Sequence, residues 1–146
     1  MECYSCRSLS GEQRISPGPA IFDGEYWILE HAYPCRMKGW LVLVLKRHAE
    51  ALHELSRAEF LELAELQEKT TKILHRELNS EKEYSICFAE AEHFHHVHFH
   101  IVAKSADLPK ELKGPGIFAM LKGEDDPVLR QEIKEFCEYL AGKFAE

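Results

Sequence analysis

The sequence predicts an α+β fold, in which an antiparallel sheet of about five strands packs against two main helices. Short apolar runs, separated by turn residues, are typical of strands. Two longer segments carry apolar residues at helical spacing. Because the strands come in groups and do not alternate with helices, an antiparallel sheet is expected. The 146 residues contain no internal repeat or linker, so we expect a single domain over residues 1–146.

The turn sequence Asp23-Gly24-Glu25 predicts a hairpin between two apolar runs. The continuous apolar run 41–45 is too short for a helix, so it is expected to form a central strand buried on both faces. The last two strands follow one another across a brief acidic turn and are expected to be antiparallel neighbours. The predicted strands are residues 20–22, 26–30, 41–45, 84–89 and 96–102.

The first long helix is predicted to begin after Ser56, because Ser56 and Glu59 have the spacing of a capping box. It should end near Leu78, before Asn79 and Ser80. Its predicted buried side consists of Phe60, Leu63, Leu66, Ile73, Leu74 and Leu78.

The second long helix is predicted to start at Asp126-Pro127, since proline is favoured at the first helical position. Residues 7–19 and 103–126 contain glycine and proline breakers and are expected to be irregular. The apolar stripe of the second helix is predicted to consist of Val128, Leu129, Ile133, Phe136, Cys137, Leu140 and Phe144.

The strongest functional signal is the stretch 96–102, in which three histidines alternate with bulky apolar residues. In an extended strand, His96, His98 and His100 share one face at a spacing of about 6.7 Å, while the apolar residues face a core. Titratable side chains clustered in this way mark functional sites. Three imidazoles on one face suit a small anionic group.

The net charge of −7 argues against nucleic acid as a partner held by bulk electrostatics. No apolar run reaches the roughly 18–20 residues of a membrane span, and the first residues lack signal-peptide features. We therefore expect a cytoplasmic location and no membrane partner. Separately, His31 is expected to be a solvated or capping histidine. Four lysines are candidates for a cationic rim that binds the substrate, and the alternative is that they form ordinary solvated surface. They are Lys104, Lys110, Lys113 and Lys122.

Five cysteines, an odd number, favour reduced thiols or a metal site over a disulfide framework. The sequence Cys3-Tyr4-Ser5-Cys6 is compatible with half a zinc site, with a redox pair or with two incidental thiols. No strand is expected before this pair and no helix after it, which weakens the redox interpretation.

Residues 96–102 match every position of the pattern His-φ-His-φ-His-φ-φ, where φ is apolar. On this motif the chain resembles the histidine-triad (HIT) nucleotide hydrolases and transferases. The resemblance implies a HIT-like sheet, commonly in a homodimer, and hydrolysis of a nucleotide phosphoanhydride or phosphoramidate at the α-phosphorus, or nucleotidyl transfer. It implies that His98 is the nucleophile, that His100 contacts the phosphate oxygens and that His96 orients its neighbours. No catalytic magnesium is implied, because imidazoles and backbone amides replace the metal clamp.

The strand before the first helix is also similar to the family, whose Lys-x-His element is matched by Lys46 and His48. In one branch of the family, an N-terminal Cys-x-x-Cys pair binds zinc together with two histidines, and Cys₂His₂ is a common closed zinc set. The resemblance therefore implies a structural zinc ion with the ligands Cys3, Cys6, His48 and His96.

Several positions depart from the family pattern. Leu45 stands where many members have proline, and Trp40 stands where a histidine often follows the glycine. Residues 90–95 replace the usual Gly-Gln-Ser/Thr segment before the triad. The acidic residue that commonly holds the ribose has no clear match around His31 and Ala32. These departures affect nucleoside recognition more than the chemistry at phosphate.

Two other interpretations stay open. The three histidines can be ligands of a catalytic metal, since alternate positions of a strand suit metal binding, but this leaves Cys3, Cys6 and His48 unexplained. The chain can also be a nucleotide-binding or sensing module with little turnover.

Overall fold

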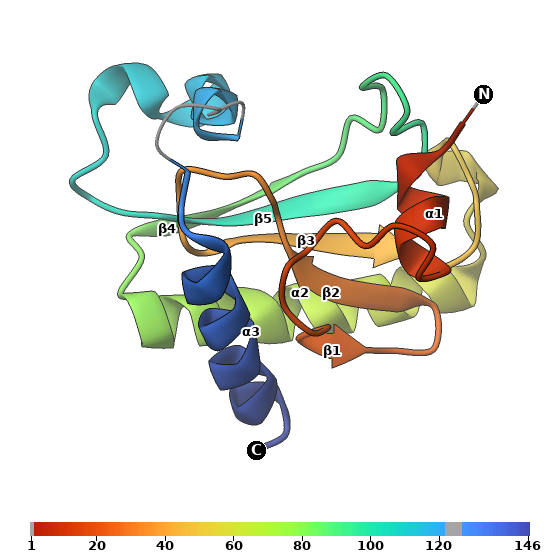
Figure 1. Ribbon diagram of the computed structural model, residues 1–146, viewed down its shortest axis with the longest axis horizontal. Helices are drawn as coiled ribbons and strands as arrows, with labels where there is room; N and C mark the ends of the chain where they lie inside the picture. Colours follow the sequence, from red (N-terminus) through yellow and green to blue (C-terminus); the bar gives the residue numbers. More distant parts are fainter. Residues whose placement is uncertain (1, 122–126) are drawn as a thin grey trace.

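The computed structural model describes residues 2–121 and 127–146 and contains a five-stranded antiparallel sheet with the order β1-β2-β3-β5-β4 (Figure 1). The sheet and its helices confirm the predicted α+β class. The strands are β1 (Phe22–Asp23), β2 (Trp27–His31), β3 (Trp40–Leu45), β4 (Lys82–Ile86) and β5 (His98–Lys104). The α-helices are α1 (Tyr4–Leu9), α2 (Arg57–Leu78) and α3 (Arg130–Phe144), and the 3₁₀ helices are η1 (Leu52–Glu54), η2 (Lys110–Leu112) and η3 (Gly114–Met120).

The strand pairing follows the predictions. β1 and β2 form the expected hairpin, β3 lies in the middle of the sheet, and β4 and β5 are antiparallel neighbours. β3 also pairs with β5, so that Val44 lies opposite His98 and Val42 lies opposite His100. The two histidines therefore lie on a strand that is held on both sides.

α2 and α3 cover one face of the sheet, the lower side in Figure 1. α2 begins with the predicted capping box: the Ser56 hydroxyl accepts the Glu59 N–H at 3.1 Å, and the Glu59 carboxylate accepts the Ser56 N–H at 2.7 Å. The main core fills the space between these helices and the sheet, where it includes Trp27, Leu29, Leu43, Leu66, Leu74, Ile101, Ile133 and Leu140.

The opposite face of the sheet carries a smaller core and the candidate site. The segment that was predicted to be irregular folds partly into η2 and η3, which lie above the sheet in Figure 1. Ile117 of η3 is fully buried here with Trp40 and Val102. Side chains alternate along a strand, so His98 and His100 belong to the face that this smaller core leaves partly open.

α1 is a helix that the sequence did not predict. Cys3 is its N-cap, and the Cys3 sulfur accepts the Cys6 N–H at 3.4 Å. A helix of six residues has little stability of its own, so contacts with the rest of the chain must hold it. They include the contacts of the two cysteines with His48 and His96 and the stacking of Tyr4 on His93. These contacts come from distant parts of the sequence, and the local pattern of residues 4–9 does not reveal them.

α3 begins at Arg130, later than predicted. Asp126 lies outside the described residues, and Pro127 precedes the helix instead of occupying its first position. The Val128 N–H donates to the carbonyl of Cys35 at 2.8 Å. This hydrogen bond ties the preceding segment to a loop, so the helix starts only after it.

Two residues predicted to be buried lie on the surface. Phe60 is 42% exposed and Leu129 is 65% exposed. Phe60 lies at the margin of the buried stripe of α2, which is centred on Leu66 and Thr70. Leu129 precedes α3 as its N-cap and does not follow the helical period.

Within residues 2–121 and 127–146, no helix combines the length and the apolar character needed to cross a bilayer.

Candidate functional site

A cavity of about 570 Å³ lies on the face of the sheet that carries His98 and His100, and both histidines line it. Its walls come from α1, from the central strands, from residues 88–91 and from η3. They are mostly apolar and include Leu9, Val42, Val44, Phe88, Phe94 and Phe118. A concave, largely apolar space with a few converging polar groups is typical of a small-molecule site.

His98 is oriented by the backbone of the triad itself. Its Nδ1 lies 2.6 Å from the carbonyl oxygen of His96, so Nδ1 carries the hydrogen and donates it. Nε2 then holds a lone pair. Burial lowers the pKa of His98, although the hydrogen bond to His96 acts in the opposite direction. At neutral pH, His98 is therefore an uncharged imidazole with a free lone pair, the form that nucleophilic attack requires.

His100 has the opposite tautomer. The indole N–H of Trp40 donates to His100 Nδ1 at 3.0 Å, so the ring hydrogen of His100 lies on Nε2. Burial lowers the pKa of His100 to about 3, and the neighbouring His98 adds to this effect. The rings of His98 and His100 are 4.9 Å apart and nearly perpendicular. Together they offer the cavity one lone pair and one N–H donor.

His96 does not line the cavity. β5 begins at His98, and the fully buried His96 ring lies just before the strand. Its Nε2 donates to the carbonyl of Leu45 at 2.6 Å, and its Nδ1 lies 3.2 Å from Nδ1 of His48. The sequence predicted three rings on one strand face, but regular pairing starts too late for His96 to share it.

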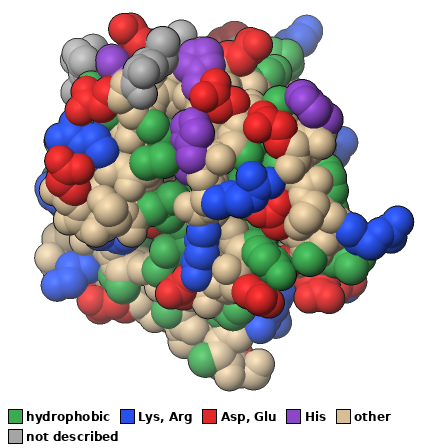
Figure 2. Space-filling view, turned by 90° about the vertical axis from the view of Figure 1, so that its right-hand side faces the viewer, with side chains coloured by type: hydrophobic (Ala, Val, Ile, Leu, Met, Phe, Trp, Pro, Cys, Tyr) green, Lys and Arg blue, Asp and Glu red, His purple; other side chains and the backbone are tan. Residues whose placement is uncertain are grey.

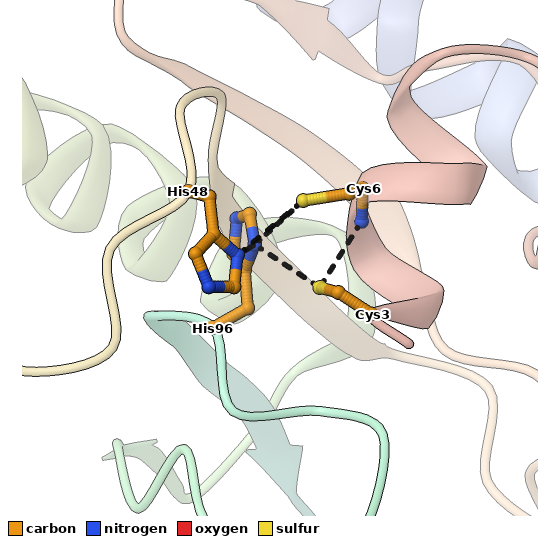
Figure 3. Close-up of side chains that lie close together, drawn as sticks. All are labelled: Cys3, Cys6, His48 and His96. Atoms are coloured by element: carbon orange, nitrogen blue, oxygen red, sulfur yellow. Dashed lines mark hydrogen bonds between the residues drawn. The ribbon is translucent and has the colours of Figure 1, made fainter. Parts of the chain in front are cut away.

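Cys3, Cys6, His48 and His96 come together between α1 and the loop after β3 (Figure 3). Their ligand atoms all lie within 4.8 Å of one another. The Cys6 sulfur is 3.4 Å from Nδ1 of His48 and 3.6 Å from Nδ1 of His96, and the Cys3 sulfur is 3.5 Å from Nδ1 of His96. Ligand atoms of a tetrahedral Cys₂His₂ zinc site are about 3.3–3.8 Å apart, given Zn–S near 2.3 Å and Zn–N near 2.0–2.1 Å. The four side chains fit a zinc ion.

The outer nitrogens of the two histidines support the same interpretation. His96 Nε2 donates to the Leu45 carbonyl, and His48 Nε2 lies 3.0 Å from the Glu50 carboxylate. Metal-binding histidines usually donate their far N–H in this way. Both Nδ1 atoms are then free of hydrogen and face each other at 3.2 Å, an arrangement that a cation would stabilise.

The lysines predicted as a cationic rim do not reach the site. Lys104 is buried on β5, and its ammonium is paired with the Glu81 carboxylate. Lys110 and Lys113 are exposed and do not line the cavity, and Lys122 lies outside the described residues. Within the described part of the chain, no lysine or arginine lines the cavity. The structure therefore does not bring Lys104 to the histidines.

Glu30 is a cavity residue that sequence reasoning missed. It is 6% exposed, and Arg14 Nη1 donates to its carboxylate at 3.3 Å. Burial raises the pKa of Glu30, while Arg14 lowers it. The signal was present in the alternation of the strand 26–30, because Glu30 pairs with Val42 and so shares a face with it.

His31 was expected to be solvated or capping, and because it is buried the first alternative was wrong. It is 1% exposed, its Nδ1 donates to the Ala32 carbonyl at 2.8 Å, and its Nε2 accepts the Gly39 N–H at 3.1 Å. Burial lowers the pKa of His31 to about 4. The ring ties the end of β2 to the start of β3.

The face shown in Figure 2 carries both acidic and basic groups. Figure 2 shows one face of the molecule, on which histidine side chains lie beside a strip of hydrophobic side chains and acidic and basic groups are interspersed.

The sequence matches a known protein family. Residues 3–113 match the family described as "Scavenger mRNA decapping enzyme C-term binding". The matched region contains the cysteine pair, the Lys-x-His element and the three histidines. A search of the curated proteins gave no match.

Solved structures of HIT proteins share the fold. A Hit-like protein from Bartonella henselae has a TM-score of 0.73 at 12% identity, over 96% of this chain and 94% of that one. A zinc-bound histidine triad family protein from Mycobacterium smegmatis has a TM-score of 0.68 at 14% identity, over 98% and 95%. The diadenosine triphosphate hydrolase of Plasmodium falciparum has a TM-score of 0.65 at 12% identity, over 86% and 76%.

Identities this low support the fold alone, and the family match over three quarters of the sequence adds membership. Because the matched residues fold into the sheet of the solved HIT proteins and hold the complete triad motif, the chain belongs to the scavenger mRNA decapping enzyme C-terminal family of histidine-triad proteins.

Proposed function

We propose that the protein hydrolyses nucleotide phosphoanhydrides or phosphoramidates at the α-phosphorus, with His98 as the nucleophile. The observation that carries this proposal is the tautomer of His98. Its Nδ1–H is engaged by the His96 carbonyl at 2.6 Å, which leaves an Nε2 lone pair on a half-buried, uncharged ring at the cavity. The family match, and the fold shared with a diadenosine triphosphate hydrolase, support a nucleotide as the substrate class.

The proposed reaction has two steps. His98 Nε2 attacks the α-phosphorus, a P–N bond forms, and the bond to the leaving group breaks with its electron pair; the leaving group takes a proton from solvent or a bound water. Water then attacks the phosphorus of the nucleotidyl group and gives up a proton to solvent, and the P–N bond to His98 breaks, which releases the nucleotide and restores the neutral imidazole. His100 Nε2–H donates to a non-bridging oxygen, where negative charge is concentrated.

The rest of the cavity suits a nucleoside. The apolar walls provide contact for a base, and the Glu30 carboxylate is an acceptor for sugar hydroxyl groups. Arg14 already holds one Glu30 oxygen, so the carboxylate is oriented before a ligand arrives. Glu30 is therefore our candidate for the acidic ribose contact that the sequence did not identify.

Zinc on Cys3, Cys6, His48 and His96 is proposed as a structural ion, and no catalytic magnesium is required by this mechanism. When bound, zinc would join α1 to the loop after β3 and to the start of the histidine strand. Because α1 contributes Ser5, Ser8 and Leu9 to the cavity wall, the ion would fix one side of the substrate site.

The arrangement of the histidines favours nucleophilic catalysis over a three-histidine metal site. His96 belongs to the cluster with the cysteines, while Nδ1 of His98 and Nδ1 of His100 are engaged by a carbonyl and by an indole. A nucleotide-binding module with little turnover would have the same cavity, so an experiment has to distinguish it from an enzyme.

The test is to acid-quench the protein with labelled dinucleoside polyphosphate or nucleoside phosphoramidate and to map the adduct by mass spectrometry. We expect a nucleotidyl group on His98. His98→Ala and His98→Asn should abolish turnover and keep nucleotide binding, while the exposed-site control His53→Asn should behave as wild type. Nucleotide binding without product would identify a binding module, and a largely active His98→Ala would exclude His98 as the nucleophile.

A further inference from the structure

We propose that Trp40 is a positioning residue for the reaction, because its indole N–H fixes His100 as the tautomer that presents Nε2–H to the substrate. The effect on catalysis rests on the proposed function. The tautomer itself does not, and it can be measured on the protein alone.

The contact between the two rings is well defined. Trp40 is fully buried at the start of β3, and its Nε1 lies 3.0 Å from His100 Nδ1. The ring centroids are 5.6 Å apart and the planes are nearly perpendicular. Phe118 packs edge-on against both, with centroids 5.5 Å from Trp40 and 5.3 Å from His100. Neither the indole of Trp40 nor the imidazole of His100 can rotate without disturbing its contacts with the other two rings.

The indole determines which ring nitrogen carries the hydrogen. An indole N–H is a donor only, so the atom that it contacts must be an acceptor. A hydrogen on His100 Nδ1 would place two N–H groups against each other in a buried space, which is costly. His100 is thereby kept both uncharged and in the Nε2–H form. The lowered pKa of His100, about 3, agrees with this description.

Nε2 has no hydrogen-bond partner among the described residues, and His100 lines the cavity. Its N–H is thus available to an oxygen of the substrate. A fixed neutral donor can stabilise developing charge without reorganising during the reaction. Because the indole cannot accept a proton, His100 cannot pass one to Trp40. Its role is therefore to donate a hydrogen bond from Nε2 to the substrate.

The direct test is the ¹⁵N NMR spectrum of histidine-labelled wild-type protein at pH 7, with His100 assigned by a His100→Asn variant. We expect the Nε2–H tautomer. If His100 is in the Nδ1–H form or is an imidazolium, the proposal is wrong, whatever the activity of the protein.

The variant test compares Trp40→Phe with Trp27→Phe. Trp40→Phe keeps an aromatic ring but removes the donor, so His100 should populate both tautomers and kcat should fall about 10- to 100-fold, with KM changed by less than about threefold. Trp40→His offers a ring N–H and should recover part of the loss.

Trp27 is the matched control. It is also fully buried, and its Nε1 donates to the Glu59 carbonyl at 2.8 Å, away from His100. Trp27→Phe should lower the melting temperature without changing the His100 tautomer or kcat. An unchanged tautomer in Trp40→Phe, or the same kcat loss in both variants, overturns the proposal. Absence of turnover in the wild type would refute the proposed function and leave the tautomer result standing.

Discussion

His98 and His100 are two residues apart on one strand, yet they are held in opposite tautomers, so that one Nε2 offers the cavity a lone pair and the other an N–H. A carbonyl holds Nδ1 of His98 as a donor, and an indole holds Nδ1 of His100 as an acceptor. The difference in chemistry between them therefore comes from their partners and not from the residue type. Both rings are half-buried, and desolvation lowers the pKa of each, so both are uncharged at neutral pH.

His31 makes the stability of the fold depend on pH. Its pKa in the fold is about 4, below the value of about 6.5 for an unfolded chain. The unfolded state therefore binds a proton first, and stability should fall as the pH drops from about 6.5 to about 4. His31→Gln keeps a donor and an acceptor but does not titrate. Urea unfolding at pH 7.5 and pH 4.5 should show a smaller loss of stability in the variant than in wild type; equal losses would exclude His31 as a source.

The N-terminus of α2 depends on one buried carboxylate. Arg47 Nε and Nη2 donate to Glu59 at 2.7 and 2.9 Å, and Ser56 completes the capping box. The hydrogen bond from Arg47, aided by Ser56, lowers the pKa of Glu59 to about 2. The carboxylate therefore stabilises the fold above about pH 4.3, and this contribution is lost as the pH falls through about 2.

Glu59→Gln should lower the free energy of unfolding by about 1–3 kcal/mol at pH 7. The matched control is Glu68→Gln on the same helix, where the exposed pair with Lys72 should contribute less than about 0.5 kcal/mol. Denaturant unfolding measures both. The difference in the free energy of unfolding between wild type and Glu59→Gln should become smaller between pH 4.5 and pH 2.5. A difference that does not change with pH would contradict the assigned role of the carboxylate.

α1 should depend on metal, because Cys3 is its N-cap and Cys6 lies in its first turn. We expect about one zinc per chain by elemental analysis. Cys6→Ser should lose the ion, melt at a lower temperature and exchange the amide hydrogens of residues 4–9 faster. Cys87→Ser changes a half-buried cysteine outside the cluster and should keep the metal. Metal-free wild-type protein with an unchanged melting temperature would rule out the structural zinc.

At the scale of the whole molecule, local sequence patterns predicted the sheet. The features that they did not predict depend on contacts between distant residues. The apolar runs, the capping box at Ser56 and the hairpin at Gly24 depend on neighbouring residues, so the sequence contains them directly. α1 and the turn of His96 toward the cysteines depend on contacts across about 90 residues. No periodicity records such contacts. The ligand set itself was available only through the resemblance to the family.

The same limit applies to charge. The sequence contains lysines near the triad, but Lys104 is paired with Glu81, and the cavity is lined by Glu30 and Glu90 with no lysine or arginine among the described residues. Arg14 offsets the charge of Glu30, but Glu90 stays without a basic residue beside it in the described part of the cavity wall, and the chain carries a net charge of −7. We therefore expect a weak net repulsion of an anionic nucleotide during its approach.

Added salt should therefore speed productive binding. Screening of like charges predicts that kcat/KM rises by up to a few-fold between about 20 and 150 mM NaCl, over which the Debye length falls to about 8 Å. A cationic rim would give the opposite slope, since salt would then weaken an attraction. Steady-state kinetics at constant pH distinguish the two signs. Lys110→Gln and Lys113→Gln, both at exposed positions, should leave the slope positive, and a negative slope that these variants reverse would restore the rim.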